Sequence, residues 1–254
     1  MRLNAAITGP GAILRALCVL AVAPTIPLHA QTYHSVETGR EIAIGGMGVA
    51  FLGFGAWQAD RNQDRVPPVV DLATIPMFDR VATRQWSLPA HHASNVLFGV
   101  ALGASIAVSI VNQNGEQPLL PVAIIAESGL LSAGLTNTVK ELVRRPRPYL
   151  YNPDAPPGAV KGEEDYVSFW SGHTANTAAM TFSCASMVQR SDASPGLKTA
   201  TWIGAAVAPA AMGYLRVKAG RHFPTDVLTG YAVGALVGLA VPYFHRAEKG
   251  AFGN

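Results

Sequence analysis

The sequence predicts an all-α protein, a bundle of about six helices embedded in a membrane. Three observations lead to this prediction. Hydrophobic residues make up 49% of the 254 residues and charged residues only 14%, whereas average soluble chains carry about 25% charged residues. The apolar residues gather in segments of helical length, which polar loops separate. Gly, Ala, Ser and Thr are frequent inside these segments, as they are where membrane helices pack closely.

Six helices are expected in sequence order. Their ranges are 41–59, 94–112, 119–144, 171–190, 198–215 and 224–243. The glycines from Gly45 to Gly55 give the first helix a face that another backbone can approach closely. No segment is a long uninterrupted run of Leu, Ile and Val, so the same helices also fit a compact soluble bundle, which is the alternative.

Two long loops are expected between the helices. Residues 60–93 alternate in charge and contain several prolines, which indicates a solvent-facing loop. A short amphipathic helix near Phe78–Trp86 is expected within it, lying at a membrane surface. Residues 149–167 form a second loop, rich in proline and acidic side chains.

Residues 1–30 resemble a secretory signal peptide. Arg2 and Arg15 are their only charged side chains, an apolar stretch follows, and Ala30 offers a small residue for cleavage. Leu28 is not the small residue usual before such a site, so an N-terminal anchor that stays attached is the alternative. Residues 31–254 are then long enough for one domain with a sizeable core.

The charge balance and the cysteines exclude two classes of function. Without residues 1–30, Lys plus Arg falls from 19 to 17 while Asp plus Glu stays at 16, which leaves a net charge of +1. The basic residues near 140–147 and 216–221 also lack the interleaved aromatics of RNA-binding proteins, so no nucleic-acid partner is expected. Cys184 is the single cysteine after residue 30, which excludes an internal disulfide and a thiolate zinc site there.

The first of three polar clusters lies where a predicted helix stops. Lys140, Arg144 and Arg147 lie near the helix end, and Pro146 and Pro148 prevent its continuation. Cations at a helix C-terminus can simply stabilise the helix dipole, and they can also mark the cytoplasmic side of a membrane protein. Arginine binds phosphate oxygens through a bidentate fork and lysine adds a point charge, so we interpret this cluster as a phosphate site.

The second cluster opens a predicted apolar helix with Ser171, Gly172 and His173. The first amides of a helix have no partner within the helix, so an anion placed there meets oriented N–H groups and the positive end of the dipole. His173 would stand beside that anion. Ser-Gly pairs also cap many helices, and this is the alternative interpretation.

The third cluster joins Arg216, His222 and Asp226. His222 precedes Pro224, a residue suited to the first helical position. Asp226 follows His222 by four residues and can reach back to accept the proton on one imidazole nitrogen. That bond would leave the other nitrogen as a nucleophile. The alternatives are a dipole-stabilised helix charge for Asp226 and a polar loop residue for His222.

Together the clusters resemble the signature of the type 2 phosphatidic acid phosphatase family. This family shares its core with vanadium haloperoxidases and bacterial class A acid phosphatases. The gap of six residues between Lys140 and Arg147 matches the family pattern. So do the five residues between Arg216 and His222 and the three between His222 and Asp226. The motifs cover residues 140–226 and place the active site at one end of the bundle.

Two positions depart from the family pattern. Trp170 stands where the family has proline, and Leu215 stands where it has serine. Neither family position carries the nucleophile, the acid or a charge that binds phosphate. The departures therefore bear on substrate preference more than on activity.

The resemblance implies a role for each matched residue. Lys140, Arg147 and Arg216 would hold the phosphoryl oxygens, while Ser171 and Gly172 would add hydrogen-bond donors.

The two histidines and the aspartate would do the chemistry. His222 would attack phosphorus and become a phosphohistidine, and Asp226 would orient it. His173 would protonate the leaving oxygen and then activate water. This mechanism needs no metal and no cofactor.

The implied function is a metal-independent phosphatase that acts on a lipid phosphate or diphosphate monoester, in the membrane and with a periplasm-facing site. The alternatives are a soluble periplasmic acid phosphatase acting on small phosphoesters, a vanadate-dependent haloperoxidase and a non-enzymatic phosphate-binding membrane protein. No obligate protein partner is inferred. Three membrane crossings after a cleaved signal peptide would place Arg147 inside the cell, so cleavage and a periplasmic site conflict.

Overall fold

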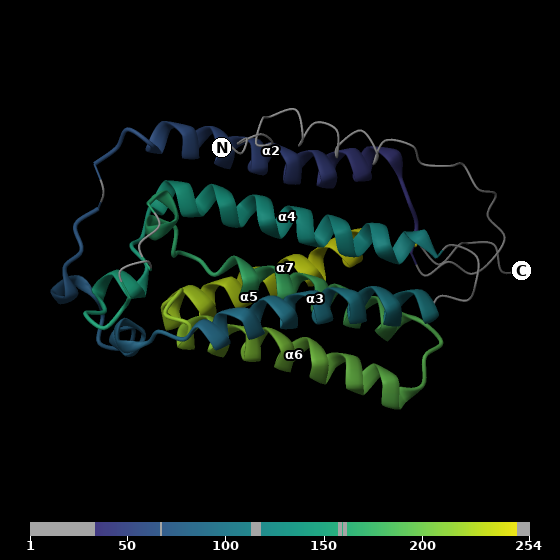
Figure 1. The fold of residues 1–254 in the computed structure, drawn as a ribbon. Helices are drawn as coiled ribbons and strands as arrows, with labels where there is room; N and C mark the ends of the chain where they lie inside the picture. The colour runs from purple at the N-terminus through teal and green to yellow at the C-terminus, as the bar shows by residue number, and fades with distance from the viewer. Residues whose placement is uncertain (1–33, 67, 113–117, 157–158, 160–161, 248–254) are drawn as a thin grey trace, which may run out of the picture. The chain divides into compact units, whose positions relative to one another are not determined.

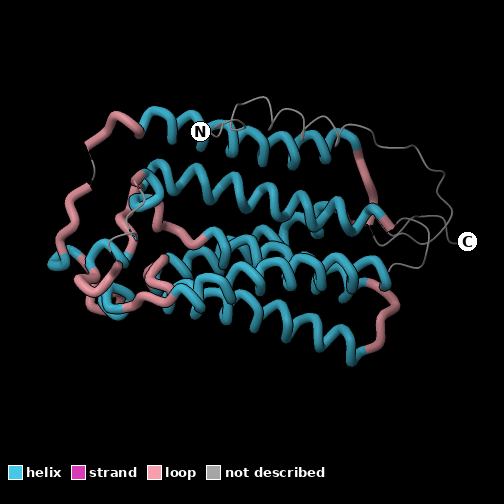
Figure 2. The backbone as a smooth tube through the Cα atoms, in the orientation of Figure 1, coloured by secondary structure: helices cyan, strands magenta, loops and turns pink. Residues whose placement is uncertain are grey.

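The computed structural model describes residues 34–66, 68–112, 118–156, 159 and 162–247. Within them lie six α-helices, and no strand is present among these residues (Figures 1 and 2). Their bounds are α2 Thr38–Asn62, α3 Leu88–Val111, α4 Leu119–Val143, α5 Gly172–Arg190, α6 Pro195–Lys218 and α7 Pro224–Phe244. The all-α prediction is confirmed. The signal peptide or anchor expected in residues 1–30 lies outside the described residues.

Successive helices run in opposite directions. The ends of α2, α4 and α6 therefore meet the beginnings of α3, α5 and α7 at one end of the bundle, on the left in Figure 1. Helix α5 is central, because it packs against α3, α4, α6 and α7, whereas α2 packs on α4. This arrangement brings the three polar clusters of the sequence to the same end. We call it the site end, and the opposite end the far end.

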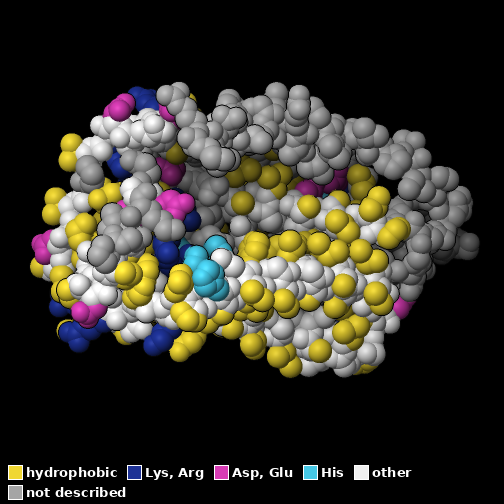
Figure 3. Space-filling model, viewed as in Figure 1, with side chains coloured by type: hydrophobic (Ala, Val, Ile, Leu, Met, Phe, Trp, Pro, Cys, Tyr) yellow, Lys and Arg dark blue, Asp and Glu magenta, His cyan; other side chains and the backbone are white. Residues whose placement is uncertain are grey.

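The outer surfaces of the helices are apolar. Large hydrophobic side chains such as Phe54, Val100, Val207 and Leu236 are exposed on them. In the described part of the face in Figure 3, hydrophobic side chains cover the length of the helices, while charged side chains gather at the left. Four segments are long and apolar enough to cross a membrane, namely Thr38–Asn62, Leu88–Val111, Leu119–Tyr151 and Pro224–Phe244. These features describe a membrane protein with several transmembrane helices.

Glycines fix how closely α7 approaches α5. A Cβ atom on Gly230 would lie 2.7 Å from the carbonyl oxygen of Ser171, and one on Gly234 would overlap the carbonyl of Ala175. Gly238 continues this face one turn further along α7. The backbones of the two helices therefore touch, which presses the start of α7 against the start of α5.

The predicted helices are all present, with one informative difference in their bounds. Helix α3 begins at Leu88, six residues earlier than expected, because the Ser87 hydroxyl caps the amide of Ala90 at 3.2 Å and Pro89 fits the first turn. The extra turn adds His91 to the site end of the bundle. The amphipathic helix expected near Phe78–Trp86 is instead a short 3-10 helix, Arg80–Arg84.

Candidate active site

A pocket of about 240 Å³ opens at the site end between α3, α4 and α5. Lys140 from the first cluster and His173 from the second line it together. No hydrogen bond or ion pair joins the Lys140 amine to any residue that the structure describes. The remaining lining residues are Phe98, Ala133, Thr136, Asn137, Gly172 and Asn176. The pocket thus offers a cation and an imidazole beside an apolar wall.

The wall behind the pocket explains Gly172 of the second cluster and Trp170, which precedes that cluster. A Cβ atom on Gly172 would lie 3.1 Å from Cγ2 of Thr136 and 3.6 Å from Nζ of Lys140, so a larger residue would crowd Thr136 beside the amine. Trp170, where the family has proline, donates its indole N–H to the Thr136 hydroxyl at 2.7 Å. Trp170 therefore supports the pocket wall from behind.

Ser171 is engaged within the fold. Its amide donates to the carbonyl oxygen of Asp226 at 3.1 Å, and its hydroxyl lies 2.9 Å from that of Thr174. The Ser171 side chain is fully buried. Both groups that the sequence assigned to phosphate binding at this residue are thus engaged inside the protein, the amide with α7 and the hydroxyl within α5.

His222 is buried, and its protonation can be deduced from one bond. Its Nδ1 atom lies 2.7 Å from the carbonyl oxygen of Ser168. A carbonyl only accepts, so Nδ1 carries the proton and Nε2 of the neutral ring carries a lone pair. Burial, with the positive charges of Arg216 and Arg147, holds the pKa of His222 well below its ordinary value of 6.5. The ring is therefore neutral at physiological pH.

Asp226 does not make the hydrogen bond expected from the sequence. Its Oδ2 atom lies 3.7 Å from Nδ1 of His222, which is beyond hydrogen-bonding distance. The same oxygen accepts from the Ser168 hydroxyl at 2.6 Å and from the Phe223 amide at 2.9 Å. The carboxylate turns back to cap α7, so Ser168 stands between Asp226 and His222.

Arg145 joins Asp226 to the 60–93 loop. Its guanidinium lies 2.5 Å from Oδ1 of Asp226 and 2.7 Å from Oδ2 of Asp79. Thr225 adds bonds from its amide and hydroxyl to Asp79, at 3.0 and 2.6 Å. The guanidinium also lies over the ring of Phe223, 4.0 Å from its centroid. Two fully buried carboxylates are thus paired with one shared arginine.

Arg147 and Arg216 are buried cations whose charges both act on His222. Arg147 donates from Nε to the carbonyl of Glu164 at 2.6 Å. Arg216 donates to the Ser94 hydroxyl at 3.2 Å and lies 3.1 Å from Nδ1 of His91. Its Nε atom is buried and has no hydrogen-bond partner among the described residues. An anion would satisfy this donor.

His173 faces α3. Its Nε2 atom lies 3.1 Å from Oδ1 of Asn95, and its ring lies 5.5 Å from that of Phe98. Burial and the charges of Arg216 and Lys140 lower the pKa of His173 from 6.5 to about 3. In the site without substrate, this histidine is therefore neutral.

The structure brings every predicted site residue to one end of the bundle. It also adds residues that the sequence analysis did not select. These are Asp79, His91, Ser94, Asn95, Arg145 and Ser168. The alternating charges of residues 60–93 were a sequence signal for Asp79. The signal for Arg145 was its position between Arg144 and Pro146 in the first cluster. Ser94 and Asn95 had no comparable signal. They are single uncharged polar residues in an expected helix, and nothing in the sequence indicates that their side chains reach Arg216 and His173.

Comparisons with known proteins agree with the motif resemblance. The family model of the PAP2 superfamily matches residues 121–249, about half of the chain. Among solved structures, this chain is similar to a transmembrane PAP2-type phosphatidylglycerolphosphate phosphatase from Bacillus subtilis, with 22% sequence identity and a TM-score of 0.48. The match covers 78% of this chain and 95% of that one. No curated protein matches the sequence significantly.

Proposed function

Since the chain belongs to the PAP2 superfamily, we propose that it is a membrane phosphatase that removes a terminal phosphoryl group from a lipid phosphate or diphosphate through a phosphohistidine. The observation that carries the proposal is the state of His222. It is buried and neutral, its Nδ1 proton is held by the Ser168 carbonyl, and the positive charges of Arg216 and Arg147 act on its ring. This is the form in which an imidazole attacks phosphorus.

In the first step, Nε2 of His222 attacks phosphorus and the bond to the leaving oxygen breaks. Lys140, Arg147 and Arg216 neutralise the charge on the phosphoryl oxygens, which is the role that Mg²⁺ has in many phosphoryl-transfer enzymes. His173 gives its proton to the leaving oxygen.

In the second step, water attacks the phosphohistidine and His173 takes the proton from that water. The bond between phosphorus and His222 breaks, and inorganic phosphate leaves. Because His173 is neutral in the empty site, its first proton must arrive with the substrate or after the phosphate charge is in place. Asp226 acts on His222 indirectly, because it accepts hydrogen bonds from the Ser168 hydroxyl and from the Phe223 amide at the start of α7.

The position of the pocket supports a lipid substrate. Its wall contains Phe98 and Ala133, and the outward face of α3 exposes further apolar side chains, Val96 and Val100. Figure 3 shows histidine side chains at the border between the charged end and the apolar surface. A lipid held there would place its phosphate among the cations and its chains along the helices. A soluble phosphoester would use only the cations that hold the phosphate and would leave the apolar helix surfaces unoccupied.

We further propose that the site faces the periplasm. Helices α2, α3 and α4 alternate in direction, so the start of α2 lies at the end opposite the site (Figure 1). A periplasmic site then requires a cytoplasmic start of α2, which is incompatible with cleavage of residues 1–30 outside the cell. A reporter inserted after Arg190, at the far end of α5, tests this orientation. Fluorescent GFP is expected there, and active alkaline phosphatase at the same point would reverse the orientation.

The function is tested by phosphate release from the detergent-purified protein, with EDTA present. The panel contains phosphatidate, phosphatidylglycerol phosphate, an isoprenyl diphosphate and soluble phosphoesters. Release from one lipid class is expected, with inhibition by vanadate, and with a loss of at least about 10³-fold in His222→Ala. The matched control is His92→Ala, which removes an exposed histidine beside the site. Release from soluble esters alone would support the acid phosphatase alternative, and phosphate binding without release would support the non-enzymatic one.

A further inference from the structure

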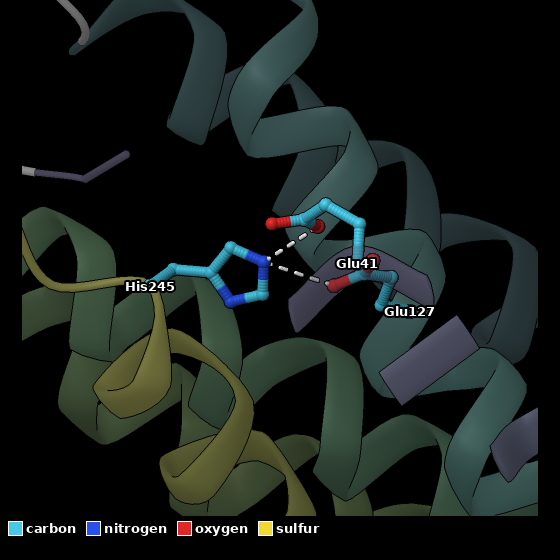
Figure 4. A group of neighbouring side chains, drawn as sticks. All are labelled: Glu41, Glu127 and His245. Atoms are coloured by element: carbon cyan, nitrogen blue, oxygen red, sulfur yellow. Dashed lines mark hydrogen bonds and ion pairs between the residues drawn. The ribbon is translucent and has the colours of Figure 1, made fainter. Parts of the chain in front are cut away.

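A second group of ionisable side chains lies at the far end of the bundle. Glu41 comes from the first turn of α2, Glu127 from α4, and His245 directly follows α7 (Figure 4). Nε2 of His245 lies 2.9 Å from Oε2 of Glu41 and 3.0 Å from Oε2 of Glu127. One ligand atom from each residue lies within 4.8 Å of the other two.

The other ring nitrogen of His245 determines which atom faces the carboxylates. Nδ1 lies 2.8 Å from the carbonyl oxygen of Val241, which only accepts, so Nδ1 carries a proton. In a neutral ring, the lone pair of Nε2 then points at two carboxylate oxygens. Metal-binding histidines typically have this arrangement, with the second nitrogen bonded to a backbone carbonyl.

The carboxylates are held in the same way. The outer oxygen of Glu41 accepts from the Arg40 guanidinium at 3.1 Å and from the Glu37 amide at 3.2 Å. Its inner oxygen is thereby turned toward His245. Arg40 offsets the negative charge of Glu41 but forms no ion pair with Glu127.

Two buried polar groups here lack partners among the described residues. Oε2 of Glu127 accepts no hydrogen bond, although it lies beside His245. His34 is 1% exposed, its backbone pairs with that of Arg246, and neither of its ring nitrogens has a hydrogen-bond partner. Unsatisfied polar atoms of this kind are rare in folded proteins. A proton on Nε2 could be shared between the two carboxylates but would not fully satisfy both.

The geometry points to a divalent transition-metal site formed by Glu41, Glu127 and His245. An imidazole with two carboxylates suits Zn²⁺ or Mn²⁺ better than Ca²⁺ or Mg²⁺, which prefer oxygen ligands alone. Ligands about 2.0–2.1 Å from a tetrahedral ion lie roughly 3.4 Å apart, so the observed spacings need to open by only a few tenths of an ångström. Water would complete the coordination.

Such an ion would hold the far end of the bundle together. The three ligands belong to α2, α4 and the residue after α7, and Glu41 and His245 are 204 residues apart in sequence. A link between such distant segments stabilises the folded state because the ligands are not assembled in the unfolded chain. This role is independent of phosphoryl transfer at the site end.

The test uses the full chain in detergent, purified with a tag that contains no histidine and stripped with EDTA. Zn²⁺ and Mn²⁺ are titrated by calorimetry, bound metal is counted by elemental analysis, and thermal unfolding is followed with and without each ion. We expect one ion per chain and a higher melting temperature with the ion. Wild-type protein that binds neither ion would overturn the proposal, and the shared-proton interpretation would replace it.

Variants assign the site. Glu127→Gln and His245→Gln are expected to weaken binding at least tenfold, and Glu41→Gln serves if either of these fails to fold. The matched control is Glu37→Gln, which removes a nearby exposed carboxylate and should bind like the wild type. Equal binding by Glu127→Gln, Glu41→Gln and the wild type would place the ion elsewhere and refute the assignment.

Discussion

The two ends of the bundle solve the problem of buried charge in different ways. At the site end, Asp79 and Asp226 share Arg145, and every oxygen that they present has a donor. At the far end, Glu41 and Glu127 share His245, and a buried oxygen of Glu127 makes no hydrogen bond with the described residues, although Nε2 of His245 lies 3.0 Å away.

At the site end the hydrogen bonds of the buried carboxylates are therefore complete, whereas at the far end they are incomplete. The acidic residues of the site end are satisfied by the protein, and its surplus cations, Lys140 and Arg216, remain to meet an anion. At the far end, Arg40 pairs with one oxygen of Glu41, and carboxylate oxygens of Glu41 and Glu127 both face Nε2 of His245, where we propose the cation. Variants at the site end should therefore change turnover, and variants at the far end should change stability alone.

The largest effect on stability is expected for Arg145→Ala. It would leave two fully buried carboxylates without their cation, which costs about 3–5 kcal/mol of folding free energy. Turnover should fall by about 10²-fold or more, because the carboxylates also hold Ser168 and the start of α7. Denaturant unfolding and phosphate release measure both. Arg84→Ala, an exposed arginine of the same region, is the control, and equal behaviour of the two variants would show that the network has no such role.

Gly234→Ala should be next, because its methyl group would overlap the Ala175 carbonyl and push α7 away from α5. A loss of about 1–3 kcal/mol of stability is expected from overpacking, with reduced turnover, since this contact sets the distance between His222 and His173. Gly204→Ala, where nothing lies within 4 Å of the added carbon, is the matched control. Unchanged melting of Gly234→Ala would mean that the helices are not in backbone contact.

Asn95→Ala should have a smaller effect, confined to the site end. Loss of the 3.1 Å contact would free the His173 ring to rotate, so kcat should fall by about tenfold, as for a misplaced general acid, with KM nearly unchanged. Steady-state kinetics of this variant and of His92→Ala provide the measurement. A rise in KM with normal kcat would instead assign Asn95 to substrate binding.

The pH dependence should reflect both histidines. The lowered pKa of His222 keeps it neutral as the pH falls through 6.5, so kcat/KM should show no loss from this group between pH 7 and pH 6.5. His173, with a pKa of about 3 in the empty site, lacks the proton that it must donate. The substrate monoanion can bring that proton, so kcat/KM should rise as the pH falls from 8 toward the phosphate pKa of about 6. A decline of kcat/KM over this range would contradict the assigned protonation states.

The smallest effect on activity is expected at the far end. Glu127→Gln should lower the melting temperature by a few degrees, about 2–4 °C per kcal/mol for a chain of this size, and leave kcat within about twofold. Thermal unfolding and turnover of the same preparation decide this. A large loss of kcat with an unchanged melting temperature would show that the far end contributes to catalysis, which contradicts the separation of roles between the two ends.

The sequence alone determined the helices and the reactive residues. Helix ranges follow from local apolar segments and caps, which is why all six were predicted within a few residues except the start of α3. Lys140, His173, His222 and Asp226 were found because their spacing matches a known signature.

The tertiary structure decided how these residues are connected. The Ser168 carbonyl, rather than Asp226, accepts the His222 proton, because the approach of α7 to α5 turns that carboxylate toward Arg145 and the α7 cap. Asp79 and Asn95 reach the site, and Glu41 meets His245, across long stretches of sequence. Such contacts depend on how the helices pack against one another. Local sequence patterns contain no information about which distant helices pack together, so they could not predict these contacts.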